Sequence, residues 1–257
     1  PKPQNPLRKI FYKLKMLKFV FNLMALVSAT PLREILTSSP VFDDNLFKQL
    51  LVRKDLNHLL LTDVEHLTSL IGLEFSEVVT LKTIGQTWQG RNITMIEIDA
   101  REYLQNKTGV DHRLLSKPAI LLTGAHHARE FVSIQMPLYS VLRMLHGGIV
   151  FQQPTYISKL IQNKYYVIPV VNVDGLADIE QTFLTTGNVT TRRKNMNPHN
   201  NENCTAEESG VDLNRNYAVY WDKPGGNSPD PCAESYRGTH PFSEPETRAI
   251  RDFLKAH

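Results

Sequence analysis

Long apolar segments, repeats and cysteines are scarce in this sequence. No apolar run approaches the roughly 20 residues that a transmembrane helix needs, so no membrane span is predicted. No internal repeat or low-complexity tract is present, which excludes a repeat array. The apolar content of 41% and the charged content of 21% are instead typical of an ordinary globular protein.

Acidic residues are absent from the first 29 residues, which carry six lysine or arginine side chains. Without these six positive charges, the net charge of the chain falls from +3 to −3. The positive excess is therefore confined to one end of the chain. It is no evidence for a nucleic-acid partner, and we expect none.

Residues 16–29 resemble a secretory signal peptide. Lysines precede an apolar run at 19–27, and small residues at 27–29 fit a cleavage site. An amphipathic or anchoring helix is the alternative. Residues 1–15 are then upstream sequence, because the chain does not begin with methionine and Met16 stands where an initiator would stand.

We therefore expect a protein that is secreted or lies within the secretory or lysosomal pathway, with a mature form that is not in a membrane. Residues 30–44 contain two prolines and a pair of serines and are predicted to be an irregular lead. From residue 45 to residue 257 no internal boundary is visible, so one domain is expected.

The chain contains two cysteines, Cys204 and Cys232. In a secreted chain an isolated pair is most simply a disulfide. The bridge would close a loop of 27 intervening residues, worth about 3 kcal/mol on the chain-entropy model. Two free thiols are the alternative if the chain is not secreted.

The periodicity of apolar residues predicts an α/β fold. Helices are expected at 46–73, 134–145, 155–163 and after a capping box of Ser243 and Glu246. Strands are expected at 78–84, 92–98, 119–122 and 165–173, and most of 183–235 should be loop. Alternating strands and helices indicate an α/β sheet. We predict that this sheet is mixed and has helices on both faces, which is a three-layer α/β/α arrangement.

Two of these segments carry more specific expectations. The strand at 119–122 is continuously apolar, which suits burial on both faces, so it should be central in the sheet. The strand at 165–173 ends at Asp174-Gly175, which we interpret as a strand-to-loop turn without a catalytic role.

A histidine and a glutamate three residues apart follow the strand at 119–122. They are His127 and Glu130, in the segment 123–130. Imidazole nitrogen and carboxylate oxygen suit Zn²⁺ at roughly 2.0–2.2 Å, and a catalytic zinc site has three protein ligands and one open position. Taken alone, the pair could equally be a surface histidine and glutamate on one helical face.

Five further motifs accompany this pair in order: 84–91, 171–175, 192–194, 211–216 and 231–238. In this order and spacing, the set resembles the zinc metallocarboxypeptidases of the carboxypeptidase A/B family. The resemblance runs from about residue 45 to the last residue. It implies a carboxypeptidase-like fold truncated at its C-terminal side, a Zn²⁺ cofactor, and removal of C-terminal residues from peptides or proteins.

The resemblance also implies roles for individual residues around the metal. His127 and Glu130 would bind zinc, and Asp212 would orient His127 through its second ring nitrogen. Arg193 would stabilise the oxyanion of the tetrahedral intermediate. Without the family match, a solvated basic run would be the default interpretation of Arg193.

Substrate binding is implied for three more residues. Asn214 and Arg215 would hold the C-terminal carboxylate, because a planar guanidinium matches a carboxylate bidentately. Arg129 would contribute to an outer subsite. These three side chains and Arg193 should converge around the mouth of the metal site. A plain turn is the alternative interpretation of Asn214 and Arg215.

The family's third zinc ligand, its general-base glutamate and the residue that sets side-chain preference have no counterpart before His257. Neither His240 nor His257 matches the ligand position. We therefore expect the chain as given to bind zinc weakly and to be inactive alone.

Two other functions stay open from the sequence. A catalytically inactive relative would still bind peptide C-termini through Arg193, Asn214 and Arg215. A deacylase or amidoligase-like relative would share only the zinc motif, and the clamp of Asn214 and Arg215 argues against it. In each case we expect a monomer.

Overall fold

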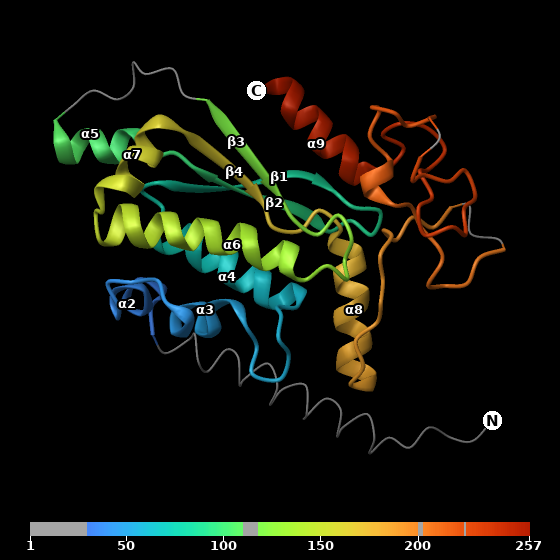
Figure 1. The fold of residues 1–257 in the computed structure, drawn as a ribbon, viewed down its shortest axis with the longest axis horizontal. Helices are drawn as coiled ribbons and strands as arrows, with labels where there is room; N and C mark the ends of the chain where they lie inside the picture. The colour runs from blue at the N-terminus through green and yellow to red at the C-terminus, as the bar shows by residue number, and fades with distance from the viewer. Residues whose placement is uncertain (1–29, 110–117, 200–202, 224) are drawn as a thin grey trace.

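The computed structural model of this chain describes residues 30–109, 118–199, 203–223 and 225–257. The expected signal peptide and the upstream residues before it lie outside these ranges. Helices pack on both faces of a four-stranded mixed sheet (Figure 1). The α/β fold class predicted from the sequence is confirmed.

The sheet contains β1 (Val79–Gln86), β2 (Asn92–Ile98), β3 (Ala119–Thr123) and β4 (Lys164–Ile168) in the order β1-β2-β4-β3. Neighbours β1 and β2, and β2 and β4, are antiparallel, whereas β3 and β4 are parallel. The turn between β1 and β2 contains Gly90 at φ 75°, a backbone conformation that favours glycine.

Helices α4 (Leu61–Glu74) and α6 (Val132–Met144) cover one face of the sheet, and α9 (Pro245–Ala256) covers the other (Figure 1). Glycines allow the close approach on both faces. A Cβ atom on Gly72 of α4 would lie 2.6 Å from Leu81, and a Cβ atom on Gly85 of β1 would lie 2.6 Å from Ala249.

The remaining helices surround this centre. Helices α2 (Leu32–Thr37) and α3 (Asp44–Leu51) pack against α4 and α6, and α5 (Arg101–Thr108) meets α7 (Pro154–Gln162) at one end of the molecule. Helix α8 (Val173–Thr186) stands at the other end (Figure 1). None of the helices in the described ranges combines the length and the apolarity needed to cross a bilayer.

The prediction of an irregular lead at 30–44 was wrong. Helix α2 lies within it, and Leu32, Ile35 and Leu36 are all buried. Short helices are marginal by themselves, so this burial against α4 is what stabilises α2. Tertiary packing therefore made this segment helical. Its two prolines lie outside the helix.

The prediction that the strand at 119–122 is central was also wrong for the part of the chain that the structure describes. There β3 is the end strand of the sheet, paired only with β4. Ala119 and Ile120 are correspondingly exposed. Continuous apolar sequence signalled a strand, but strand order depends on pairing between distant segments.

The end of β4 and the start of α8 differ from the prediction made from the sequence. Strand β4 stops at Ile168, and α8 begins at Val173, where the Asn172 side chain accepts a hydrogen bond from the Gly175 backbone. Asp174 therefore lies in the first turn of a helix and not in a strand-to-loop turn. Its buried carboxylate accepts hydrogen bonds from Thr87 Oγ1, Gln89 N and Arg91 Nη1, which fastens the β1–β2 turn to α8.

Two helix boundaries also differ from those predicted. Helix α6 does not end at the two glycines but continues as a π-helix, Leu145–Val150. A Cβ atom on Gly147 would lie 2.3 Å from Tyr156, so glycine permits α7 to approach there. The prediction of a capping box at Ser243 and Glu246 was wrong, because Glu244 and not Ser243 is the N-cap of α9.

Candidate metal centre

The candidate metal site lies in the loop that follows β3. Gly124 fastens this loop beside the end of β4, because its N–H donates to Ile168 O at 2.8 Å and its carbonyl accepts from Val171 N at 3.0 Å. A Cβ atom on Gly124 would lie 2.1 Å from Ser133 O, so only glycine fits where the loop begins. The strand end thus delivers the following residues, His126 to Glu130, to one edge of the sheet.

His127 and Glu130 face each other, as the sequence predicted. His127 Nδ1 lies 2.7 Å from Glu130 Oε1, and His127 Nε2 lies 2.8 Å from Asp212 Oδ1. The histidine is buried, whereas half of the Glu130 side chain is exposed. One ring nitrogen therefore points to a solvent-accessible carboxylate, and the other points to a buried one.

The donor set fits one zinc ion. An ionised Asp212 only accepts hydrogen bonds, so it selects the proton on Nε2 and leaves the lone pair of Nδ1 directed toward Glu130. Among the residues that the structure describes, no three His, Cys, Asp or Glu side chains are grouped so that they could hold a metal ion. His127 and Glu130 could supply two of the three ligands that a catalytic zinc site requires.

Arg193 lies directly beside this pair. Its Nη2 donates to Asp212 Oδ2 at 2.8 Å, and its Nη1 lies 3.2 Å from His127 Nδ1 and 3.6 Å from Glu130 Oε1. The guanidinium is mostly buried, with 16% of the side chain exposed. Arg193 is therefore no solvated basic residue, which had been its default interpretation.

Asp212 is the centre of this cluster. Burial by itself raises the pKa of this carboxyl, but the hydrogen bond from His127 and the charge of Arg193 prevail, so its pKa lies below the usual value. Its Oδ1 also accepts from Asn214 N at 2.9 Å. The ionised carboxylate thus joins the metal loop, Arg193 and the turn that carries Asn214.

Asn214 and Arg215 lie in a short 3₁₀ turn, Leu213–Arg215. Asn214 is exposed, and Arg215 Nη1 donates to the Asn214 carbonyl at 3.1 Å. Arg215 Nε donates to the carbonyl of Gly226. Both residues are accessible from solvent on the segment that Asp212 anchors.

Arg129 is hydrogen-bonded to Glu234, which belongs to the motif at 231–238. Its Nη1 donates to Glu234 Oε1 at 2.8 Å and to Thr191 O at 3.3 Å. The hydrogen bond from Arg129 lowers the pKa of Glu234. No sequence pattern links these residues, because 105 positions separate Arg129 from Glu234.

His126 points to a different partner from His127. Its Nε2 lies 2.8 Å from the hydroxyl of Tyr217. Burial, and then the neighbouring His127, lower the pKa of His126 to about 4, so the ring is neutral near pH 7. Sequence reasoning missed Tyr217, although it directly follows the motif at 211–216.

His240 and His257, which do not match the third zinc ligand in the sequence, contact other groups. His240 Nδ1 contacts the carbonyl of the next residue, Pro241, at 2.9 Å. His257 stacks on Phe253 with ring centroids 4.4 Å apart. Neither belongs to a metal-holding group within the described part of the chain.

The predicted disulfide is confirmed. Cys204 and Cys232 are bridged, with Cα atoms 5.1 Å apart. Beside the bridge, the buried Lys194 Nζ donates to the carbonyls of Pro231 and Ala233 at 2.7 and 3.0 Å. The disulfide loop is thereby fastened to the residue that follows Arg193.

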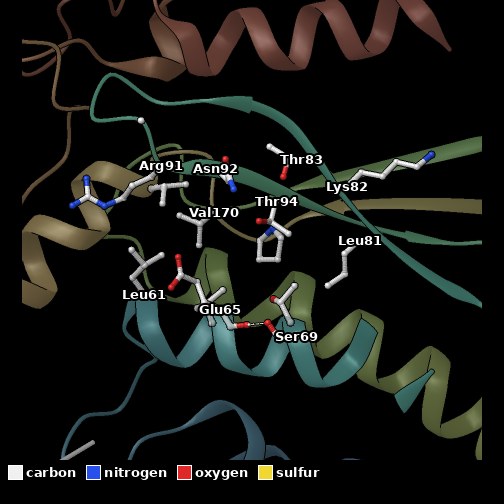
Figure 2. Close-up of a pocket in the computed structure, with 15 residues that line it drawn as sticks. Leu61, Glu65, Ser69, Leu81, Lys82, Thr83, Arg91, Asn92, Thr94 and Val170 are labelled. Atoms are coloured by element: carbon white, nitrogen blue, oxygen red, sulfur yellow. Dashed lines mark hydrogen bonds between the residues drawn. The ribbon is translucent and has the colours of Figure 1, made fainter. Parts of the chain in front are cut away.

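A cavity of about 620 Å³ lies away from this site, between α4 and the β1–β2 hairpin (Figure 2). Leu61 and Val170 line it together with polar side chains such as Glu65 and Thr94. None of the site residues predicted from the sequence lines this cavity. The cavity is therefore not part of the candidate metal centre.

The chain is similar to known zinc carboxypeptidases. A sequence model described as zinc carboxypeptidase matches residues 64–257. Carboxypeptidase B of Astacus astacus is 30% identical over 182 residues, which are 71% of this chain and 51% of that protein. The chain thus spans about half the length of this relative.

The fold of this chain resembles those of solved structures. The crystal structure of thrombin activatable fibrinolysis inhibitor matches with a TM-score of 0.64 and 24% identity, over 92% of this chain and 50% of that one. Carboxypeptidase A from Helicoverpa armigera matches with a TM-score of 0.59 and 24% identity, over 83% of this chain and 49% of that one. The carboxypeptidase-like fold expected from the sequence is confirmed.

Proposed function

Because this chain belongs to the zinc carboxypeptidase family, we propose that it serves in zinc-dependent removal of C-terminal residues from peptides or proteins. The observation that carries this proposal is the grouping of His127, Glu130, Asp212 and Arg193 within hydrogen-bonding or ion-pairing distance. These residues come from three separate segments of the chain. Their chemistry matches the needs of peptide hydrolysis at a chain end.

Two residues of the described chain would hold the metal, namely His127 through Nδ1 and Glu130 through its carboxylate. A bound zinc ion supplies a Lewis acid and lowers the pKa of its water toward about 7. Asp212 keeps the proton of His127 on Nε2, so Nδ1 stays available as a ligand. The third ligand would have to come from outside the residues described here.

Charge that develops on the substrate would be met by arginine. Arg193 is held by Asp212 with its Nη1 beside the metal-facing nitrogen, where it can donate to an oxygen that becomes negative. Arg215 and Asn214 would hold the C-terminal carboxylate on the exposed turn. Arg129, at the more open contact with Glu234, would meet residues further along the peptide.

A second candidate is a carboxypeptidase-like protein that binds peptide C-termini without cleaving them. Its support is that Arg193, Asn214 and Arg215 could hold a terminal carboxylate whether or not a metal is bound. We also propose that the 257-residue chain alone does not turn over, because a catalytic zinc needs a third protein ligand besides His127 and Glu130. Both candidates use the same arginines, so they predict the same preference for a free C-terminus.

One assay separates the candidates. The chain, and any longer product of the same reading frame, is mixed with an N-blocked dipeptide that ends in a free carboxylate, and with its C-terminal amide. Release of the terminal amino acid that stops on chelation supports the enzyme. Binding of the free acid without release supports the binder. Equal affinity for acid and amide contradicts both.

We also propose that the protein follows the secretory route as a monomer, cleaved after residue 29. The disulfide supports this, because such bonds persist mainly in oxidising compartments. Secretion from cultured cells, N-terminal sequencing and size-exclusion chromatography test it. A product retained in the cytosol with free thiols would contradict it.

A further inference from the structure

Two consecutive histidines hold the two ends of the turn that carries Asn214 and Arg215. On the N-terminal side, His127 Nε2 lies 2.8 Å from Asp212 Oδ1. On the C-terminal side, His126 Nε2 lies 2.8 Å from the Tyr217 hydroxyl. The metal loop therefore contacts the candidate carboxylate clamp on both flanks, and not only through Asp212.

The contact between His126 Nε2 and the Tyr217 hydroxyl is a partly buried hydrogen bond between residues 91 positions apart. The Tyr217 ring also packs edge-on against Phe242 with centroids 5.8 Å apart. The hydroxyl is thus the polar end of an otherwise packed side chain.

Arg215 depends on such support more than the other arginines. Arg193 is paired with Asp212 and Arg129 with Glu234. Arg215, in contrast, donates to the backbone carbonyls of Asn214 and Gly226. Backbone contacts on the surface leave the guanidinium charge available to a ligand, but the position of the turn then rests on its flanking anchors.

We propose that His126 is a positioning residue for the carboxylate clamp, acting through Tyr217 to fix the C-terminal end of the turn that carries Asn214 and Arg215. This inference rests on the proposed role of these two residues in binding a terminal carboxylate. Bidentate binding by a guanidinium depends on geometry. A displaced turn therefore weakens recognition of the carboxylate without removing any group that touches it.

The test measures binding to the metal-free chain, so it does not require turnover. Isothermal titration calorimetry compares an N-blocked dipeptide free acid with its C-terminal amide for wild type, Tyr217→Phe, His126→Phe and the double variant. We expect each single substitution to weaken binding of the free acid about threefold to tenfold, as for one lost hydrogen bond, and to leave binding of the amide unchanged. The double variant should lose little more than either single one.

Matched controls are Tyr103→Phe on α5 and the exposed His240→Phe, which should change neither affinity. Zinc affinity, measured by chelator competition, should stay within about twofold of wild type in Tyr217→Phe, because His127 keeps its contact with Asp212. Tyr217→Phe preserves the ring, so it decides the question even if His126→Phe does not fold.

Arg215→Gln separates this inference from the proposed function. If Arg215→Gln abolishes the preference for the free acid while Tyr217→Phe leaves it intact, the role of His126 is refuted and the clamp stands. Equal weakening of acid and amide by Tyr217→Phe also refutes it, because a general loss of structure would do the same. If Arg215→Gln leaves the preference unchanged, the clamp itself fails, and the inference fails with it.

Discussion

His127 Nε2 and Asp212 Oδ1 lie 2.8 Å apart, although 85 positions separate these residues in the chain. The Asp212 carboxylate has no exposed surface, and Arg193 binds its second oxygen at 2.8 Å. A buried carboxylate with two charged or polar partners fixes the ring of the histidine and its tautomer. The candidate metal ligand is thus oriented by the fold before any metal binds.

Replacing Asp212 should therefore weaken zinc binding. In Asp212→Asn, the amide no longer selects the proton on Nε2 and no longer balances Arg193. We expect zinc affinity to fall about 10-fold to 100-fold, as is typical when the hydrogen-bond partner of a ligating histidine is lost. Chelator competition measures this. Asp222→Asn, at an exposed aspartate, is the matched control, and equal zinc affinities in the two variants would contradict the orienting role.

Arg193 and Arg129 should affect catalysis differently in a form of the protein that turns over. Arg193→Gln removes a donor beside the metal-facing nitrogen, so kcat should fall about 10²-fold to 10³-fold. Arg129 forms an exposed pair with Glu234, so Arg129→Gln should mainly raise KM for longer peptides. Steady-state kinetics on a dipeptide and a pentapeptide separate the two effects. The assignment of Arg193 would be wrong if only its KM changed.

The disulfide should stabilise the loop that carries the arginines. Cys204 and Cys232 are 28 positions apart, and opening the bridge should lower the free energy of unfolding by about 3 kcal/mol on the chain-entropy model. Guanidinium unfolding of the Cys204→Ser, Cys232→Ser double variant measures the loss. A reductant should lower the midpoint of wild type but not of this variant, and an unchanged wild-type midpoint would contradict the prediction.

Glu246 should make stability depend on pH in the neutral range. Burial, followed by the nearby charge of Glu244, raises its pKa from the ordinary value of 4.5 to about 8 in the folded chain. Between these pH values the folded state keeps a proton that the unfolded state has released. This contribution to stability is therefore fully present below pH 4.5 and is lost as the pH rises through about 8.

Guanidinium unfolding of wild type and Glu246→Gln from pH 5 to pH 9 tests this prediction. The neutral amide cannot titrate, so the stability of wild type relative to the variant should decrease as the pH rises toward 8 and level off above it. Glu102→Gln, at an exposed glutamate on α5, is the control and should run parallel to wild type. Parallel curves for Glu246→Gln would show that this carboxyl does not titrate in that range.

Local features of the sequence determined much of this protein. The positions of β1 and β2 follow from alternating apolar residues, because a side-chain period of two is visible over a few positions, and the position of β3 follows from a short continuous apolar run. The contact between His127 and Glu130 is equally local, because the two residues are only three positions apart in the chain. The cysteine pair was identifiable because it is the only pair in the chain.

Contacts between distant segments decided the rest. Ser243 has the residue type of an N-cap, but its hydroxyl bonds Asn216 and Glu244 instead, so the helix begins one residue later. The contact of His126 with Tyr217 crosses 91 positions and leaves no trace in local periodicity. Composition and spacing report short-range preferences, whereas strand order, the partners of each arginine and the choice of cap depend on which segments the fold brings together.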